Sequence, residues 1–380
     1  MHYFYWYLYL LLWFFALLSP NISVKAQERL LGIYCAIWAF VFGFRRYDVG
    51  NDTLNYALFF ENSGTTGFYG TIDNPDPSFE EGFMALSKFM NFFTNSATFI
   101  FLMIGIGVWT FIYYLYKNQS KTPILSLLFM MTITGRVFYT LEIAVRQTIS
   151  IIVFGFGILF LLKSNIVHWY KIFHSKYALI GFLLCMFSVT IHRTTGLLIL
   201  LLIFIYFVHL SKFISYVLVG VFTIIAVFSA DYFTQLFDGV LLVIEGFSSE
   251  NVSVLGDRYL GDMETMNYHK SALVAWVIPT LLTIYLSPKS VINTYFFKVF
   301  IFTFCLHQLM QFSTLHERLL TPFIILGFTY SIPEICIKNR TIYNLYLLIA
   351  FYYVAYIDYK VFMNWPIKID SAVPYYFIWQ

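Results

Sequence analysis

The stretch "RRYDVGNDTLNY", residues 45–56, gathers side chains that can handle phosphate and sugar groups. Its candidate site residues are Arg45, Arg46, Asp48, Asp52, Asn55 and Tyr56. Arginine forms paired hydrogen bonds with phosphate oxygens. A carboxylate beside an arginine stays ionised and can accept a proton from an attacking hydroxyl, while amide groups suit sugar hydroxyls. Together these side chains fit the transfer of a sugar from a lipid pyrophosphate to a hydroxyl.

Further cationic and ionisable residues occur at the ends of other apolar stretches. They are Arg136, Arg146 with Gln147, the pair His192 and Arg193, Arg258, and His316 with Arg318. Several arginines at one depth repel one another unless an anion lies among them. We therefore expect these residues to converge on an anionic group such as phosphate or pyrophosphate.

Each of these residues also has a purely structural interpretation. Arg45 and Arg46 fit snorkelling at a membrane interface, and the residues around Gly50 fit a turn that stabilises only its own loop. Glu142 and Arg146 are four positions apart and fit a helical ion pair. Structural roles also exist for the remaining residues, namely a helix-end histidine (His192), a helix–helix contact (Arg136), a loop ion pair with Asp257 or Asp262 (Arg258) and a solvated turn (His316, Glu317 and Arg318).

The composition indicates a membrane protein. The 380 residues are 60% hydrophobic and only 11% charged, whereas soluble domains contain about 25% charged residues. The four cysteines are Cys35, Cys185, Cys305 and Cys336, and their spacing matches neither zinc sites nor redox motifs. We expect them to be buried thiols without a disulfide.

Twelve apolar stretches predict an all-α, polytopic protein with about 12 transmembrane helices. They cover residues 3–18, 30–44, 97–116, 123–141, 144–162, 177–191, 195–210, 213–230, 271–287, 291–312, 319–336 and 341–358. We interpret the first as a retained span, because it lacks the basic n-region of a signal peptide. Residues 82–94 are too few to cross, and their spacing predicts a helix at the interface. Residues 1–380 are expected to form a single membrane domain.

Basic residues in the short connections predict that the N-terminus lies outside. The inner connections then contain Lys25, Arg29, Lys117, Lys121, Lys163, Lys171, Lys176, Lys212, Lys289, Lys338 and Arg340, offset by Glu28 and Glu334. The long connections 45–95 and 231–270 fall outside and hold most of the acidic residues. The candidate residues lie on this outer side, so we expect an outward-facing site.

The sequence resembles the EpsG family, relatives of the Wzy-type polymerases of bacterial surface polysaccharides. The likeness rests on "RRYDVGNDTLNY", "EEGFMALSKFM", "VRQTIS" and "IHRTTGLL". These segments resemble, in order, the family's R-x-x-x-x-G-x-D-x-x-x-Y loop, E-x-G-F/Y segment, R-Q helix start and H-x-S/T turn. The likeness is strongest from residue 44 to about 210. Arg193 departs from the pattern, since a small residue is more usual after the histidine.

The resemblance implies a glycosyltransferase of polysaccharide biosynthesis, with a GT-C-like helical bundle in the bacterial cytoplasmic membrane. It would transfer a growing O-antigen, capsular or exopolysaccharide chain from undecaprenyl pyrophosphate to a new lipid-linked repeat unit on the outer face. The expected partners are the lipid-linked donor and acceptor glycans, the bilayer and a chain-length regulator protein. No metal, cofactor or nucleic acid is expected.

The resemblance also implies roles for the candidate residues. Arg146, with Gln147, would bind the pyrophosphate, and Asp52 or His192 would act as the base. Tyr56 would stack on a sugar. The remaining substrate-binding candidates are Arg45, Arg46, Asp48, Asn55, Arg193, Arg258 and Arg318.

Other functions compete with this interpretation. A flippase for lipid-linked oligosaccharides also has about twelve spans, but it should carry its charges deep in the bundle and show two related halves. An O-antigen ligase shares the donor and the chemistry. A membrane acyltransferase would need a deep histidine and a cytosolic donor site, and a non-catalytic scaffold would not need the outer arginines. The sugar, the linkage and the stereochemistry are not encoded in any motif.

Overall fold

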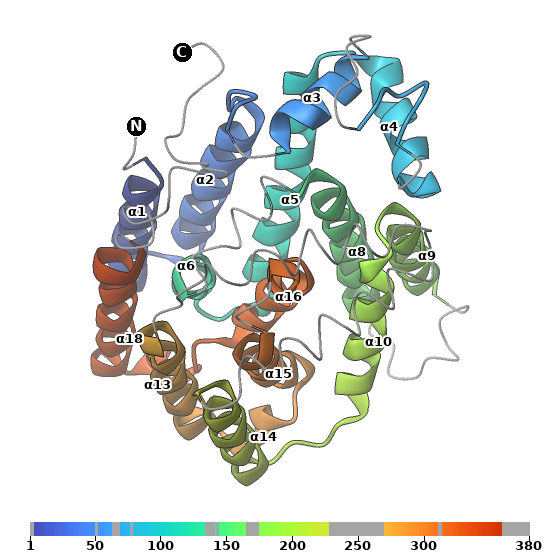
Figure 1. Cartoon of the computed structure of the whole chain (residues 1–380). Coiled ribbons are helices and arrows are strands. Elements are labelled where there is room, and N and C mark those ends of the chain that lie inside the picture. Colours follow the sequence, from blue (N-terminus) through green and yellow to red (C-terminus); the bar gives the residue numbers. More distant parts are fainter. Residues whose placement is uncertain are drawn as a thin grey trace.

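A computed structural model describes residues 4–49, 52–62, 69–76, 79–133, 141, 144–164, 175–227, 270–310 and 314–358. Within these ranges, side chains are described except at 133, 270–275, 309–310, 314–319 and 356–358. The described residues form helices joined by turns, with an isolated bridge between Gly70 and Pro75. Figure 1 shows the helices packed as a bundle. The all-α fold class is therefore confirmed.

The described helices follow one another along the chain. In the first half they are α1 (Phe4–Leu18), α2 (Val24–Gly43), α3 (Thr53–Glu61), α4 (Glu81–Phe93), α5 (Ala97–Gln119), α6 (Pro123–Ile133), α8 (Val145–Lys163), α9 (Lys176–Ile191) and α10 (Thr194–Phe207). A helix over residues 212–227 follows. The rest are α13 (Lys270–Leu286), α14 (Lys289–Ile292), α15 (Tyr295–Met310), α16 (Thr314–Gly327), α17 (Ile335–Lys338) and α18 (Arg340–Tyr352), with η1 (Ser19–Asn21), η4 (Phe328–Tyr330) and η5 (Tyr353–Asp358).

Polar residues in the short connections start several of these helices. The side chains of Ser23, Ser96 and Ser175 each accept a hydrogen bond from the backbone N–H three residues later, at the starts of α2, α5 and α9. Asn339 caps α18 in the same way. Such caps satisfy backbone donors that the helix itself leaves open, so these boundaries are set locally by the sequence.

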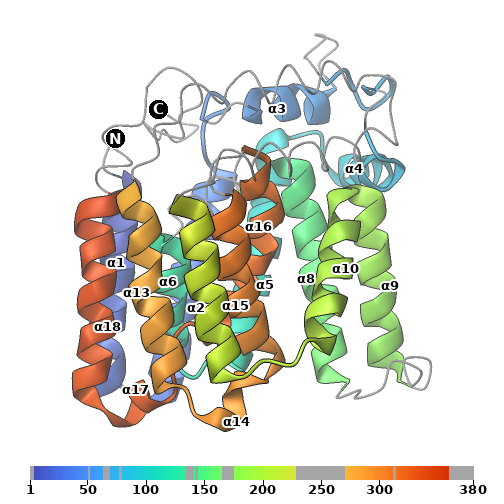
Figure 2. The same ribbon diagram turned by 60° about the horizontal axis from the view of Figure 1, so that its bottom comes forward.

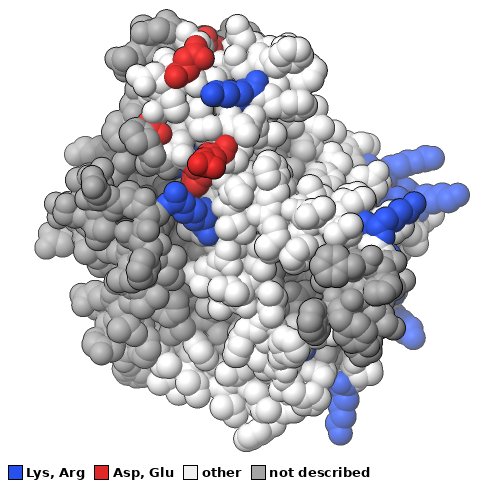
Figure 3. Space-filling view, turned by 90° about the vertical axis from the view of Figure 1, so that its right-hand side faces the viewer, with Lys and Arg blue, Asp and Glu red and all other residues white. Residues whose placement is uncertain are grey.

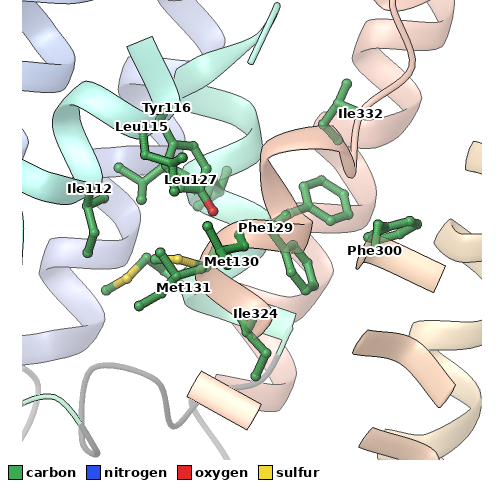
Figure 4. Close-up of a cluster of buried hydrophobic side chains, with 14 of the residues drawn as sticks. Ile112, Leu115, Tyr116, Leu127, Phe129, Met130, Met131, Phe300, Ile324 and Ile332 are labelled. Atoms are coloured by element: carbon green, nitrogen blue, oxygen red, sulfur yellow. The ribbon is translucent and has the colours of Figure 1, made fainter. Parts of the chain in front are cut away.

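Helix α6 lies at the centre of the bundle. Every residue from Thr122 to Thr132 is buried. A helix that is apolar on all sides has no solvent face and packs inside other helices. Figure 4 shows side chains of α6, including Leu127 and Met130, between α5 and the α15–α16 region. The main apolar core is built around this helix.

Helices α8 and α9 pack with their backbones in close approach. A Cβ at Gly181 of α9 would lie 2.7 Å from the carbonyl oxygen of Gly157 on α8. Cys185 also contacts Gly157 across this interface. Only glycine allows two helix backbones to come so near. The two helices run antiparallel, so the start of α8 lies beside the end of α9.

A smaller, aromatic-rich core lies at one end of the bundle, which we call the site end. It joins α3, α4 and the segment between them to the adjacent ends of α2, α5, α8 and α9. Phe59, Phe79 and Phe83 pack together in this core, with ring centroids 5.1–5.9 Å apart. Figure 2 shows α3 and α4 at this end, beyond the ends of the long helices. The prediction of a helix over residues 82–94 is confirmed by α4.

The opposite end of the bundle, which we call the basic end, carries most of the lysines. Lys117 at the end of α5 pairs with Glu28 of α2 at 3.0 Å. Lys212 and Lys298 donate to backbone carbonyls of Tyr285 and of Tyr206 and Val208. In Figure 3, blue side chains project from the right edge, while the red ones gather at the upper left with blue ones among them, and a broad uncharged face lies between these regions. The charge asymmetry predicted for the connections is present in three dimensions.

Large apolar side chains cover much of the lateral surface. They include Leu183 and Phe187 on α9, Leu200 and Phe204 on α10, and Leu348 on α18. Exposed apolar surface on this scale is typical of a face that contacts a membrane or another protein. By length and composition, α5 and α8 could cross a membrane, and the other apolar helices are shorter. The twelve predicted stretches each contain a described helix, but the number of crossings stays a prediction.

The four cysteines are buried and free, as expected from their apolar surroundings. Residues 134–140 of the predicted fourth span and the predicted outer connection 231–270 lie outside the described residues, apart from Lys270 at the start of α13. The other long outer connection, 45–95, is described in large part and contains the elements that build the site.

Candidate functional site

Glu80, in the segment that leads into α4, is the centre of a polar cluster at the site end. Its Oε2 is 3.0 Å from Nη1 of Arg146 on α8, and its Oε1 is 3.3 Å from Nδ1 of His192. The backbone N–H of Arg193 donates to the same Oε1 at 3.4 Å. The side chains of Arg146, His192 and Glu80 are 21%, 14% and 10% exposed, so the cluster is shielded yet keeps some contact with solvent. We call these three side chains the Glu80 cluster.

The residues after Glu80 explain why its carboxylate reaches the bundle. A Cβ at Gly82 would lie 2.7 Å from the carbonyl carbon and oxygen of Thr190 at the end of α9. The missing side chain therefore lets the start of α4 come up against α9. Phe83 is fully buried in the aromatic core and holds α4 in this position. The sequence Glu80-Glu81-Gly82-Phe83 thus supplies the charge, the close approach and the anchor.

The turn between α9 and α10 places His192 beside Glu80. Helix α9 ends at Ile191, and His192 is extended while its N–H still bonds the carbonyl of Ser188. Ser150 of α8 holds this turn in place, because its hydroxyl donates to the Ser188 carbonyl at 2.8 Å and is 2.6 Å from the Thr195 hydroxyl. One residue of α8 therefore ties together the end of α9 and the start of α10.

Aromatic residues of the outer connection surround Arg146. Its guanidinium carbon lies 4.6 Å above the ring of Phe79, in the geometry of a cation–π contact. The Tyr56 hydroxyl is hydrogen-bonded to Arg146, and the Tyr56 and Tyr69 rings are 4.8 Å apart. Tyr69 is in turn hydrogen-bonded to Asp52. A chain of contacts therefore leads from Asp52 to the Glu80 cluster.

The electrostatics of the site favour the ionised carboxylate. Burial alone would raise the pKa of Glu80, but the hydrogen bond with His192 and the charge of Arg146 outweigh burial and lower this pKa to about 2. Burial, together with Tyr56 and Asp52, raises the pKa of Tyr69 well above its usual range. At neutral pH, Glu80 is therefore an anion and Tyr69 is a neutral phenol. A carboxylate with so low a pKa is a poor proton acceptor.

The arrangement can bind an anion and move a proton. Arg146 has five N–H donors, and guanidinium groups bind phosphate oxygens in pairs. A histidine side chain is suited to move a proton near physiological pH, and His192 is the histidine of the cluster. Among the described residues, no group of three His, Cys, Asp or Glu side chains has the arrangement of a metal site.

The structure brings together five of the residues predicted from the sequence. Asp52, Tyr56, Arg146, His192 and the backbone of Arg193 belong to one connected set of contacts. Arg193 itself is exposed beside this set. Their predicted roles in catalysis or binding stay predictions, whereas their proximity in space is now established.

The predicted residues at the end of α2 lie in different surroundings. Arg45 is fully buried, donates to the carbonyl of Phe42 at 3.1 Å and stacks on the rings of Phe42 and Phe101. Arg46 and Asp48 form an ion pair of 2.7 Å at the surface. The exposed Arg46–Asp48 pair fits the interpretation of a loop that stabilises itself. The full burial of Arg45 does not fit snorkelling, which keeps the charged group in water. A role of these residues in substrate binding stays a prediction.

The remaining candidates are only partly placed. Gln147 is buried on α8 next to Arg146, and Asn55 is half-buried on α3. Arg318 lies on α16, but its side chain is outside the described residues, as are Arg136, Glu142 and Arg258 altogether. The helical pair of Glu142 with Arg146 is therefore untested, whereas a pair of Arg146 with the distant Glu80 is observed.

Sequence reasoning missed Glu80, Tyr69, Phe79 and Ser150. Glu80 carried a signal, because the segment "EEGF" contains an acid followed by a glycine, a pattern that suggests a charged group at a point of close approach. Tyr69 and Phe79 resemble many other aromatics in a chain that is 22% aromatic. Ser150 looks like an ordinary polar residue within an apolar helix, and its role depends on contacts that span 38 and 45 positions.

Comparison with known proteins gives one match. The model of the EpsG family matches residues 28–377, which is most of the chain. No curated protein and no solved structure matches.

Proposed function

Because the chain belongs to the EpsG family, we propose that it polymerises lipid-linked oligosaccharide repeat units at the outer face of the bacterial cytoplasmic membrane. The growing glycan moves from undecaprenyl pyrophosphate to the terminal sugar of a new lipid-linked unit. The product is a surface polysaccharide such as an O-antigen, a capsule or an exopolysaccharide. Family membership supports the coarser role in polysaccharide biosynthesis, and the donor and the reaction are our proposal.

The observation that carries the proposal is the Glu80 cluster with its aromatic surroundings. A pyrophosphate leaving group needs cationic donors, and Arg146 is positioned by Glu80, Tyr56 and Phe79 at the site end. An acceptor hydroxyl needs a base, and His192 and Asp52 lie in the same connected set. The rings of Tyr56, Tyr69 and Phe79 are buried around Arg146 and pack against one another, so they position the guanidinium. The stacking of Tyr56 on a sugar remains part of the proposal.

The distribution of charge supports the outward orientation. The basic end carries the lysines of the short connections, and basic residues are retained on the cytoplasmic side of membrane proteins. The site end carries Glu80 and the acidic residues of the 45–95 connection. Twelve crossings in a GT-C-like bundle would place the cluster at the outer surface, where flipped repeat units arrive.

The chemistry follows from these groups. The acceptor oxygen attacks the anomeric carbon of the donor sugar while its proton passes to the base. The bond from that carbon to the pyrophosphate oxygen breaks, and the electron pair leaves with the lipid pyrophosphate. Arg146 offsets the charge that develops on this oxygen. Removing one such electrostatic donor from an enzyme lowers its rate by roughly 10²–10³.

The test is the chain length of surface glycan in cells that carry Arg146→Ala, with membrane protein levels checked. We expect the ladder to collapse to a single repeat unit on its acceptor, and Arg146→Lys to restore it only in part, because lysine lacks the paired donors. Loss of all surface glycan, including single units, would instead favour a flippase or a ligase. An unchanged ladder would contradict the proposal at its central residue.

Two kinds of partner follow from the proposed function, namely the lipid-linked substrates and a chain-length regulator protein. The donor and acceptor are lipids with long polyprenyl tails, and the exposed apolar faces of α9 and α10 give those tails a surface beside the site. A chain-length regulator protein would act on the same product. Co-purification of the chain with such a regulator from the native membrane tests the second partner.

A further inference from the structure

Glu80 contacts both of the groups to which the proposed function gives chemical roles. Its two oxygens divide between them: Oε2 faces Arg146, and Oε1 faces Nδ1 of His192 and the N–H of Arg193. The three contacts join segments that are 66, 112 and 113 positions apart in the chain. Such a carboxylate determines the orientation of its partners as well as their distance.

The geometry at His192 bears on its protonation. A carboxylate is an acceptor, so the ring nitrogen that faces it must carry the proton. In neutral imidazole the other nitrogen then has the lone pair. The contact of Glu80 with Nδ1 therefore selects the tautomer in which Nε2 is the basic nitrogen. A carboxylate paired with histidine in this way also stabilises the imidazolium that forms when Nε2 takes a proton.

We propose that Glu80 is the positioning residue of a Glu80–His192 pair in which Nε2 of His192 is the general base for the acceptor hydroxyl. This inference rests on the proposed polymerase function. The hydroxyl proton moves to Nε2 as the oxygen bonds the anomeric carbon, and the electron pair of the broken bond leaves on the lipid pyrophosphate. The imidazolium afterwards releases its proton to solvent, which restores the pair.

The same geometry separates His192 from the other candidate base. Asp52 is hydrogen-bonded to Tyr69, and its link to the cluster passes through Tyr69 and Tyr56. Glu80 itself is held by cationic and donating partners and does not act as the base. The histidine is thus the proton acceptor that contacts a carboxylate able to orient it.

The charged groups around His192 set the expected pH dependence. Glu80 contacts the ring, Arg146 of α8 shares that carboxylate, and Arg193 follows in the same turn. Helix α4, which packs on α9, also carries Glu81 and Lys88. Lys176 of α9 lies at the far end of that helix. Replacing Glu80 by a neutral residue removes the anion that contacts the ring, which favours the neutral imidazole.

The experiment uses native membranes that contain the host's own lipid-linked repeat units, and follows their conversion to longer glycan between pH 5.5 and 9. Wild-type membranes should show a rate that rises with pH as His192 loses its proton. In Glu80→Gln we expect a maximal rate that is roughly tenfold to a hundredfold lower. The rising limb of the plot of rate against pH should move to lower pH, because the ring no longer contacts an anion. Glu80→Asp should keep the limb near its wild-type position, and His192→Gln should remove it.

Each alternative outcome has its own meaning. A rate that falls equally at every pH in Glu80→Gln, with the limb unmoved, makes Glu80 structural and overturns the inference. Failure of the wild-type membranes to lengthen the glycan overturns the proposed function instead. If Glu80→Gln does not fold, the tautomer is read in the wild-type protein by ¹⁵N NMR of labelled histidine, assigned with His192→Gln. A proton on Nε2 instead of Nδ1 above the pKa of the ring would exclude the pair.

Discussion

Helix α6 and the Glu80 cluster use buried polar groups in opposite ways. In α6 the polar side chains bond close by in the sequence, as Thr132 does to the carbonyl of Leu128 and Ser126 to the hydroxyl of Ser120. The carboxylate of Glu80 bonds partners at least 66 positions away. The central helix therefore depends on apolar packing, while the cluster fixes how three distant segments lie relative to one another.

This difference separates stability from function. A defect in α6 should weaken the whole bundle, because its side chains contact helices on every side. A defect in the cluster should misplace a few groups at one end, and it should cost only the stability that the contacts of Glu80 contribute. Substitutions in the two regions test that separation, from the largest expected effect on stability to the smallest.

Leu127→Ala in α6 should cause the largest loss of stability. Leu127 is fully buried, so its removal leaves a cavity and costs about 2–5 kcal/mol by analogy with buried leucines elsewhere. Leu348→Ala on α18 is the matched control, because Leu348 is 65% exposed. Lipid can fill the space that its shortened side chain leaves, so no cavity forms. Thermal unfolding in lipid nanodiscs measures both. Equal shifts for the two variants would show that burial in the bundle does not set stability.

Acidification should destabilise the protein through Glu80. Its pKa in the folded chain, about 2, lies below the ordinary value of 4.5, so the ionised form stabilises the fold above about pH 4.5. That contribution is on the order of 3 kcal/mol and is lost as the pH falls from 4.5 through about 2. Measuring the free energy of unfolding of wild type and of Glu80→Gln across this pH range isolates the contribution of Glu80. A difference that stays constant with pH would mean that Glu80 is not held as an anion.

Gly82→Ala should affect activity more than stability. The new methyl group meets backbone atoms of Thr190, so α4 must shift away from α9, at a cost of about 1–3 kcal/mol. The shift separates Glu80 from His192 and should shorten the glycan ladder. Gly220→Ala is the control, since nothing lies within 4 Å of its Cβ position and alanine favours a helix. A normal ladder in Gly82→Ala would show that the cluster tolerates movement of α4.

Asp48→Ala should have the smallest effect on stability. The ion pair with Arg46 is exposed to solvent, and such pairs contribute about 0–1 kcal/mol. Unfolding temperature and ladder length are measured together. A shorter ladder at unchanged stability would support the predicted substrate contact of Asp48, and a lower unfolding temperature would show that the pair holds the outer connection in place.

The fold was largely predictable because its signals are local. Apolar stretches of helical length and caps such as Ser96 and Ser175 mark the helices in the sequence itself. The charge pattern of the connections predicted which ends lie together. Arg146 and His192 could be singled out as candidate site residues because charged groups beside apolar helices stand out.

The pairing within the site was not predictable in the same way. Nothing local to Glu80 identifies Arg146 as its partner, and the nearer Glu142 offered a simpler pair. The burial of Arg45 beneath Phe42 and Phe101 likewise depends on how α2 meets α5. Residues that act through contacts across 66 or more positions are found only when the helices are assembled.

The glycine contact between α8 and α9 has a consequence for how related chains can diversify. Gly157 and Gly181 bring the backbones of α8 and α9 together well away from the Glu80 cluster. The two helices are therefore held to each other by their own packing and not by the side chains of the cluster. The spacing of Arg146 and His192 is thus set by a contact that lies outside the Glu80 cluster. Substitutions among the aromatic side chains around Arg146 can then change the surroundings of the Glu80 cluster without changing the distance between Arg146 and His192.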